Sequence, residues 1–275
     1  MSSFAFISLF SGSLASGEMT PFMAMLIPLL GVIAYPWLAR RFFSLYRLTE
    51  GQRRSLLRSL PQGNEAFVNR LRVWDTGETI CNAAVVGCVP GFSFVLVSDA
   101  LLTRLSPRSV AAIVAHEIGH LKLCHVPMRL VIVFAGGTLG LALVRQAETL
   151  AAWQNVAHVA AMFATAGYMG LMLHLVAPLL EYHADAYAID TLSKKNGNRR
   201  RNIRELSKAL AELTLLSGIR PDKKTWLYPS FEERRQAMLC QQTSPSFRHR
   251  LEWMLGIVLL SQLVLITIGV LMIAS

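Results

Sequence analysis

Long apolar stretches alternate with charged segments along this chain, and four of the stretches approach the length of a membrane span. They are Phe22 to Leu38, Leu130 to Val144, Val156 to Leu180 and Leu255 to Ala274. A helix of about 20 apolar residues crosses the hydrocarbon core, and tilt or thinning accommodates shorter ones. The pattern therefore predicts about four transmembrane helices, although Leu130 to Val144 also fits an arm of a buried hairpin.

The N-terminal apolar run does not have the pattern of a cleaved signal. The first basic residue is Arg40, so no positive region precedes the apolar stretch. Phe4 to Leu14 is too short to cross a bilayer. We expect it to form an interfacial or disordered tail, with a first half-span as the alternative.

Shorter patterns between the first two spans indicate a folded unit. Phe92 to Val97 is a short apolar strand, and Ser98 is placed to cap a short helix after it. Ser106 is a good N-cap and Pro107 suits the first position of the next helix, where no backbone N–H is needed. That helix carries an apolar stripe from Val110 to Ile118, so we expect it to pack against a core.

The composition and the charges support a membrane protein. Hydrophobic residues make up 53% of the chain and charged residues only 16%, against about 25% charged in soluble domains. Basic residues cluster beside the spans, as Arg40, Arg41, Arg47, Arg53, Arg54 and Arg58, as Lys194, Lys195, Arg199, Arg200, Arg201 and Arg204, and as Arg248 and Arg250. Basic loops stay on the cytoplasmic side of a membrane. With four spans, both termini are then expected on the opposite side. The net charge of +10 predicts contact with anionic lipid and no nucleic-acid binding, since no basic motif is interleaved with aromatic residues.

The helix expected after Ser106 contains the sequence H-E-x-x-H at residues 116–120. Positions i and i+4 project from one helix face, so His116 and His120 can reach one metal ion. Glu117 lies beside them, placed to take a proton from a water molecule at the metal. Because a catalytic zinc site uses three protein ligands and an open position, a third ligand is expected elsewhere in the chain.

The segment 180–188 offers the best third ligand. Glu181 and Asp185 are again four residues apart, so one carboxylate can bind the metal while the other orients a histidine. His183 is a rival ligand, but on a helix it points roughly 160° away from Asp185. His125, five residues after His120, is expected to be a surface histidine near a helix end. The sequence thus predicts one Zn²⁺ per chain.

Several segments together resemble the M48 family of membrane metallopeptidases, which includes HtpX-type heat-shock proteases and Ste24-type CAAX prenyl proteases. The resemblance covers most of residues 79–235 and is carried by residues 97–102, 105–106 and 115–120, by the E-x-x-x-D sequence at 181–185, by Asn82 and Ala83, and by residues 228–234. It implies a zinc metalloendopeptidase that acts on membrane proteins or membrane-attached peptides.

The resemblance also implies roles for residues outside the zinc motif. Asn82 and Ala83 match a pair on a strand that edges the substrate cleft. Tyr228 stands where the family pattern has histidine; its phenol can donate a hydrogen bond to an oxyanion but carries no positive charge. Arg234 matches the family arginine and is expected to pair with Asp185 or to stabilise the transition state.

We therefore predict a mainly α, multi-pass integral membrane protein with a zincin-like α+β catalytic domain that carries a short edge-strand sheet. The expected units are 1–45 (tail and first span), 46–127 (first catalytic part), 128–180 (transmembrane hairpin), 181–250 (second catalytic part) and 251–275 (last span). The expected location is a bacterial inner membrane with the active site facing the cytoplasm. The alternative function is a non-degradative zinc sensor or scaffold similar to the M56 signalling proteins.

Four further features carry minor predictions. Gly136, Gly137 and Gly140 are small residues that let a neighbouring helix approach. His174 is expected to be a neutral histidine hydrogen-bonded between helices. Lys194 to Arg204 is expected to be a flexible basic loop. The four cysteines have no metal-type spacing and are expected to be ordinary thiols.

Overall fold

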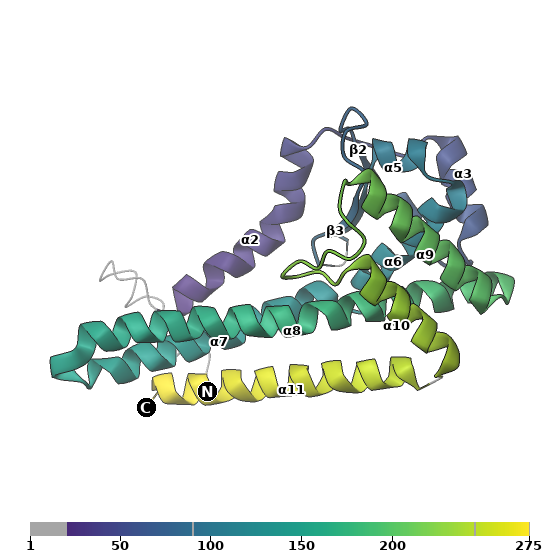
Figure 1. Ribbon diagram of the computed structural model, residues 1–275. Helices are drawn as coiled ribbons and strands as arrows, with labels where there is room; N and C mark the ends of the chain where they lie inside the picture. The colour runs from purple at the N-terminus through teal and green to yellow at the C-terminus, as the bar shows by residue number, and fades with distance from the viewer. Residues whose placement is uncertain (1–20, 90, 245, 275) are drawn as a thin grey trace.

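The computed structural model describes residues 21–89, 91–244 and 246–274, so the expected tail at Phe4 to Leu14 lies outside the described residues. Three long helices run side by side, and a unit of shorter helices and a sheet sits at one end of them (Figure 1). The long helices are α7 (His125–Glu148), α8 (Gln154–Asn196) and α11 (Phe247–Ala274). A short 3-10 helix, η1 (Ala151–Trp153), links α7 to α8.

The other helices surround the sheet or lead into it. They are α2 (Pro21–Phe42), α3 (Glu50–Ser59), α4 (Glu65–Asn69), α5 (Asp99–Arg104), α6 (Pro107–Lys122), α9 (Arg199–Leu216) and α10 (Phe231–Thr243). The described part of the chain is thus mainly helical, with a small mixed sheet, which agrees with the predicted fold class.

The sheet has four short strands in the order β1-β2-β4-β3. They are β1 (Leu45–Tyr46), β2 (Arg72–Trp74), β3 (Ala83–Val86) and β4 (Phe94–Ser98). Strands β2 and β4 are parallel, and the other two pairs are antiparallel. Strand β3 lies at the end of this order, so in the described part of the chain it forms an edge of the sheet, and it packs against α6.

The predicted helix starts are confirmed. The Ser98 hydroxyl accepts a hydrogen bond from the Leu101 amide at the start of α5. The Ser106 hydroxyl accepts one from the Ser109 amide, and proline follows it at the start of α6. The side chains from Ser109 to Gly119 are all buried, so α6 runs through the centre of the core.

Three helices in the described part of the chain are long and apolar enough to cross a membrane. They span residues 125–148, 151–196 and 247–274. The shortest predicted span, Leu130 to Val144, is the middle of a continuous 24-residue helix, and this helix packs against α8 as one arm of a helical hairpin. The first predicted span forms the 22-residue helix α2, which is not among the three, so four spans are not confirmed.

Small residues set the packing of the long helices, as expected for Gly136 and Gly140. A Cβ atom on Gly140 would lie 2.7 Å from Thr165 Oγ1 of α8, and one on Gly136 would overlap the Met169 side chain. On α11, a Cβ atom on Gly269 would lie 3.2 Å from the backbone carbonyl of Thr138 in α7. These contacts hold the three helices at close distance.

The prediction of a flexible basic loop at Lys194 to Arg204 is wrong. Helix α8 continues to Asn196 and α9 begins at Arg199, so only two residues separate the helices. Gly197 ends α8 with a left-handed φ of +68°, and the Asn198 side chain caps α9. The turn is also held from outside, because Lys195 donates a hydrogen bond of 2.7 Å to the Leu60 carbonyl.

The contact of Gly269 with α7 gives a matched test of this packing. Gly269→Leu should destabilise the protein by about 1–3 kcal/mol, because a larger side chain meets backbone that cannot move aside. Gly256→Leu on the same helix is the control, since no atom lies within 4 Å of its added Cβ. The measurement is the free energy of unfolding in detergent; equal effects of the two variants would contradict the packing.

Candidate metal centre

Three side chains from two helices converge where α6 packs against α8. His116 and His120 project from α6, and Glu181 projects from α8; their ligand atoms all lie within 4.8 Å of one another. The two Nε2 atoms are 3.1 Å apart. The Glu181 carboxylate oxygens lie 3.4 Å from Nε2 of His116 and 3.6 Å from Nε2 of His120. These are the three groups that the sequence predicts as metal ligands.

The convergence depends on a close approach of α6 and α8. A Cβ atom on Gly119 would lie 3.0 Å from the Tyr187 ring and 3.3 Å from the backbone of Ala184. Glycine between the two histidines therefore lets α8 pass directly across α6. This contact brings Glu181 opposite both imidazoles, although the segments are about sixty residues apart in the sequence.

The donor set fits a zinc ion. Two imidazoles and one carboxylate form a ligand set of catalytic zinc sites. Burial lowers the pKa of His120 to about 3, so its ring is neutral and keeps a free lone pair. Burial also opposes charge on His116, but hydrogen bonds to Asp185 and Glu181 outweigh it and raise the pKa of His116 to about 9. The fit to a metal ion therefore follows from the two imidazoles and the carboxylate that the cluster brings together.

Glu117 lies beside the cluster and is 9% exposed. Burial raises the pKa of its carboxyl group to about 7. A carboxylate with a pKa near neutrality can both take and return a proton under ordinary conditions. Its environment therefore suits the acid–base role that the sequence predicts.

Asp185 and Arg234 form a buried ion pair next to the histidines. The carboxylate of Asp185, which is 0% exposed, accepts hydrogen bonds of 2.9 Å from Nε and 2.6 Å from Nη2 of Arg234. Its Oδ1 also lies 2.9 Å from Nδ1 of His116. Asp185 thus orients a histidine, as its spacing predicts, and the expected pairing with Arg234 is present.

Helix α10 positions Arg234 through its first turn. The Ser230 hydroxyl accepts from the Glu233 amide, and the Glu233 side chain accepts from the Ser230 amide, which forms a capping box. The adjacent guanidinium then points toward α8, with Nη1 3.5 Å from the Glu181 carboxylate.

The prediction that His125 is a surface histidine is wrong. It is 1% exposed; its Nδ1 lies 2.8 Å from Nδ1 of His120, and its Nε2 lies 3.3 Å from Nδ1 of His183. The cause is Cys124, whose left-handed φ of +55° interrupts the helical path between α6 and α7 and so changes the direction in which His125 projects. A five-residue spacing on a straight helix places the two rings on different faces, so sequence reasoning missed the contact. His183, the rival ligand, contacts His125 and does not belong to the ligand cluster.

The other predicted site residues are not among the three clustered ligands. Asn82 precedes the edge strand β3, which begins at Ala83, and the backbone N–H of Asn82 donates a hydrogen bond to the Ser98 hydroxyl. Tyr228 is 53% exposed; within the described residues its phenol hydrogen-bonds to no ligand of the cluster. Arg129 was not predicted, and its Nη2 lies 3.8 Å from Glu181.

The structure also gives the surroundings of His174 and of three cysteines. His174 does not bond to a neighbouring helix as expected, because its Nδ1 lies 2.6 Å from the Trp226 carbonyl in the segment between α9 and α10. Its ring also stacks on the Trp226 ring. Cys81, Cys88 and Cys124 are free thiols, as expected.

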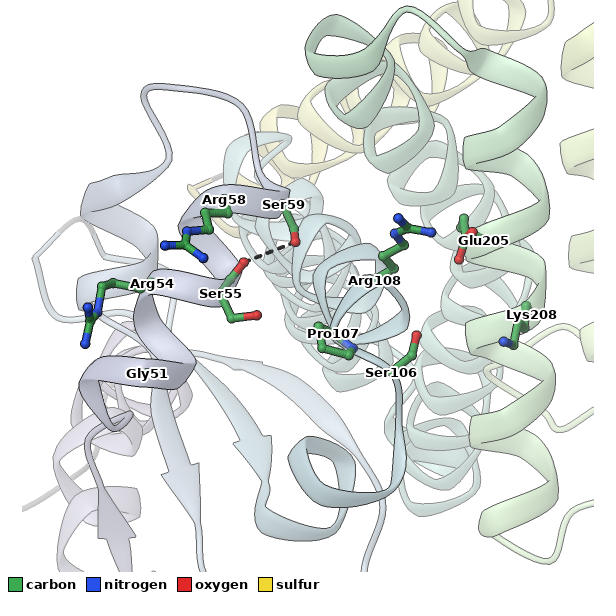
Figure 2. Close-up of a pocket in the computed structure, with 10 residues that line it drawn as sticks. All are labelled: Gly51, Arg54, Ser55, Arg58, Ser59, Ser106, Pro107, Arg108, Glu205 and Lys208. Atoms are coloured by element: carbon green, nitrogen blue, oxygen red, sulfur yellow. Dashed lines mark hydrogen bonds between the residues drawn. The ribbon is translucent and has the colours of Figure 1, made fainter.

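A basic pocket of about 690 Å³ lies at the opposite end of α6 (Figure 2). Its lining residues are Gly51, Arg54, Ser55, Arg58, Ser59, Ser106, Pro107, Arg108, Glu205 and Lys208. By the helical rise, Pro107 lies about 14 Å along the axis from His116. The pocket is therefore separate from the metal-ligand cluster.

The fold and the site together define a class of protein. A H-E-x-x-H helix, a carboxylate from a second helix and three long apolar helices are the features of a membrane metallopeptidase. Residues 54–269 match peptidase family M48, and the chain belongs to that family.

One solved structure shares this fold. The crystal structure of Ste24p from S. mikatae aligns with a TM-score of 0.60 at 20% sequence identity. The alignment covers 79% of this chain and 56% of Ste24p, so the chain spans a little over half the length of that protein. The comparison with curated proteins gave no match.

The buried ion pair can be tested by a double-mutant cycle. Asp185→Leu should destabilise the protein by about 3–5 kcal/mol, because it leaves the Arg234 charge buried without its partner. Asp185→Leu combined with Arg234→Met should cost less than the sum of the two single variants. The measurement is denaturant unfolding in detergent, and additive effects would contradict the pairing.

Proposed function

We propose that the protein is a membrane-embedded zinc endopeptidase that hydrolyses peptide bonds of membrane proteins or membrane-attached peptides. The observation that carries the proposal is the buried convergence of His116, His120 and Glu181, with Glu117 beside them. Membership of peptidase family M48 supports the same chemistry.

The three ligand side chains would hold one Zn²⁺ per chain. When bound, zinc supplies Lewis-acid activation of a water molecule and of a peptide carbonyl. Asp185 fixes the ring of His116 through the 2.9 Å contact to Nδ1, which leaves the Nε2 lone pair directed at the cluster.

Glu117 performs the proton transfers in this proposal. Its carboxylate takes a proton from the attacking water and later passes it to the leaving amine. Its pKa of about 7 suits both steps, because near neutral pH the carboxylate can accept a proton and the carboxylic acid can donate it again.

Charge on the tetrahedral oxyanion requires a further donor. Arg234 is already committed to Asp185 by two hydrogen bonds, so its main role is to fix that carboxylate beside His116. The Tyr228 phenol is exposed and is available to donate to the oxyanion. This role of Tyr228 stays a prediction.

The edge strand β3 suits an extended peptide substrate. Its outer edge offers unpaired backbone groups beside α6, starting at Asn82 and Ala83. A substrate that adds a strand there would be held mainly by backbone hydrogen bonds, which gives a loose sequence preference.

The ligands lie where the long helices leave the apolar part of the chain. Glu181 directly follows the apolar segment of α8, and α6 ends just before α7 begins. By helical rise the metal would lie within ~15 Å of the membrane surface, close to membrane-bound substrates. The basic clusters favour the cytoplasmic side, and the proposed location is a bacterial inner membrane.

The decisive variant is Glu117→Gln. It should lower peptide cleavage by about 10²- to 10⁴-fold because the general base is lost, while the zinc content stays near one ion per chain. The assay is self-cleavage of the purified chain in detergent, with zinc and with a chelator. Glu205→Gln on α9 is the matched control and should cleave normally.

Two outcomes would count against this assignment. Loss of zinc from Glu117→Gln would mean that the residue is structural. Zinc binding without any cleavage by the unaltered chain would favour the sensor or scaffold function instead.

The substrate class needs a measurement in cells. Membrane proteins should accumulate in cells that carry the Glu117→Gln chain, because their turnover depends on the active enzyme. Quantitative mass spectrometry of the membrane fraction, compared with cells that carry the unaltered chain, identifies them. If only soluble proteins changed, the proposed substrate class would be wrong.

A further inference from the structure

The two ligand histidines are supported in different ways at Nδ1, the nitrogen that faces away from the cluster. Nδ1 of His116 lies 2.9 Å from the carboxylate of Asp185. Nδ1 of His120 lies 2.8 Å from another imidazole nitrogen, Nδ1 of His125. A histidine that binds a metal through Nε2 carries its proton on Nδ1 and needs an acceptor there. A carboxylate always accepts, but an imidazole nitrogen accepts only in one tautomer.

The contacts continue from His125 to the last long helix. Nε2 of His125 lies 3.3 Å from Nδ1 of His183 on α8. Nε2 of His183 lies 3.7 Å from Oε1 of Glu252 on α11. At this distance the Glu252 carboxylate is an ion-pair contact of Nε2 and not a hydrogen bond, and within the described residues this buried nitrogen has no hydrogen-bond partner.

The negative charge at the end of this series sets a direction for the two hydrogen bonds between the histidines. A carboxylate 3.7 Å from Nε2 of His183 favours the tautomer with the proton on Nε2, which leaves Nδ1 of His183 as an acceptor. His125 then donates from Nε2 and accepts at Nδ1. That acceptor receives the Nδ1 proton of His120 and leaves Nε2 of His120 with a lone pair for the metal.

We propose that Glu252, acting through His183 and His125, fixes the tautomer of His120 and so holds this ring as a metal ligand. The three residues are positioning residues, and the series supplies to His120 what Asp185 supplies directly to His116. The inference rests on the proposed function, because it concerns the same zinc site.

Neighbouring ion pairs hold Glu252 in place. Nε of Arg248 lies 2.8 Å from its carboxylate, and Nη1 of Arg248 lies 2.8 Å from Asp190 on α8. The Glu252 side chain is 41% exposed, so the carboxylate keeps its charge through contact with water. Because Glu252 belongs to α11 while His183 belongs to α8, the support of His120 depends on how α11 lies against α8.

Zinc affinity of the full-length chain in detergent tests the inference. Glu252→Leu and His125→Leu should each weaken zinc binding by about 10-fold or more, as loss of a supporting partner does at other zinc sites. His125→Gln should retain most of the affinity, because its amide offers an acceptor and a donor as the imidazole does. The measurement is competition with a chelator of known affinity.

Gln262→Leu is the matched control on α11. Gln262 is buried and accepts a hydrogen bond from Tyr168 on α8, and among the described residues it bonds to none of the cluster's ligands. Its zinc affinity should equal that of the unaltered chain. Equal weakening in Gln262→Leu and Glu252→Leu would show an effect of α11 packing alone and would overturn the inference.

Nitrogen NMR of ¹⁵N-histidine-labelled protein reports directly which ring nitrogen of each histidine carries the proton. His120 should carry its proton on Nδ1, and His125 and His183 should carry theirs on Nε2. In Glu252→Leu the His183 resonances should shift toward a tautomer mixture. A proton on Nε2 of His120 in the unaltered chain would overturn the inference.

Failure of the inference and failure of the proposed function are distinguishable. An unaltered chain that binds no zinc overturns both. An unaltered chain that binds zinc, together with a Glu252→Leu chain of equal affinity, overturns only the role of Glu252.

Discussion

The structure depends on the close contact between α6 and α8 at Gly119. Without it, the carboxylates of Glu181 and Asp185 would not meet His116 and His120 inside an apolar core. Buried ionisable groups are costly unless each finds a partner, and here each carboxylate faces an imidazole or a guanidinium. The same packing therefore creates the metal-ligand cluster and compensates its charges.

Helix α8 carries both a candidate membrane span and one residue of the candidate metal-ligand cluster. One continuous helix of 43 residues carries the apolar segment, then Glu181, and then Asp185. Helix α7 begins shortly after His120 in the sequence, and α11 brings Glu252 close to His183. The ligand cluster thus combines two histidines of α6 with one carboxylate of the long helix α8. A rearrangement of those helices would therefore move the ligand side chains relative to one another.

Much of the site was predictable because local spacing fixes it. The H-E-x-x-H and E-x-x-x-D sequences place their side chains on single helix faces whatever the rest of the chain does. The capping residues Ser98 and Ser106 likewise act within one turn. The long apolar helices follow from composition and length, since lipid and core packing demand both.

The amino-acid sequence by itself determined the helices, the paired histidines and the candidate carboxylates, because these follow from periodicity within a single element. Only the tertiary structure decided the surroundings of His125 and His183. A left-handed residue at Cys124 and the approach of α8 and α11 create those contacts, and neither leaves a local signal in the sequence. Hydrogen bonds between distant segments depend on how helices pack, which no short stretch of residues encodes.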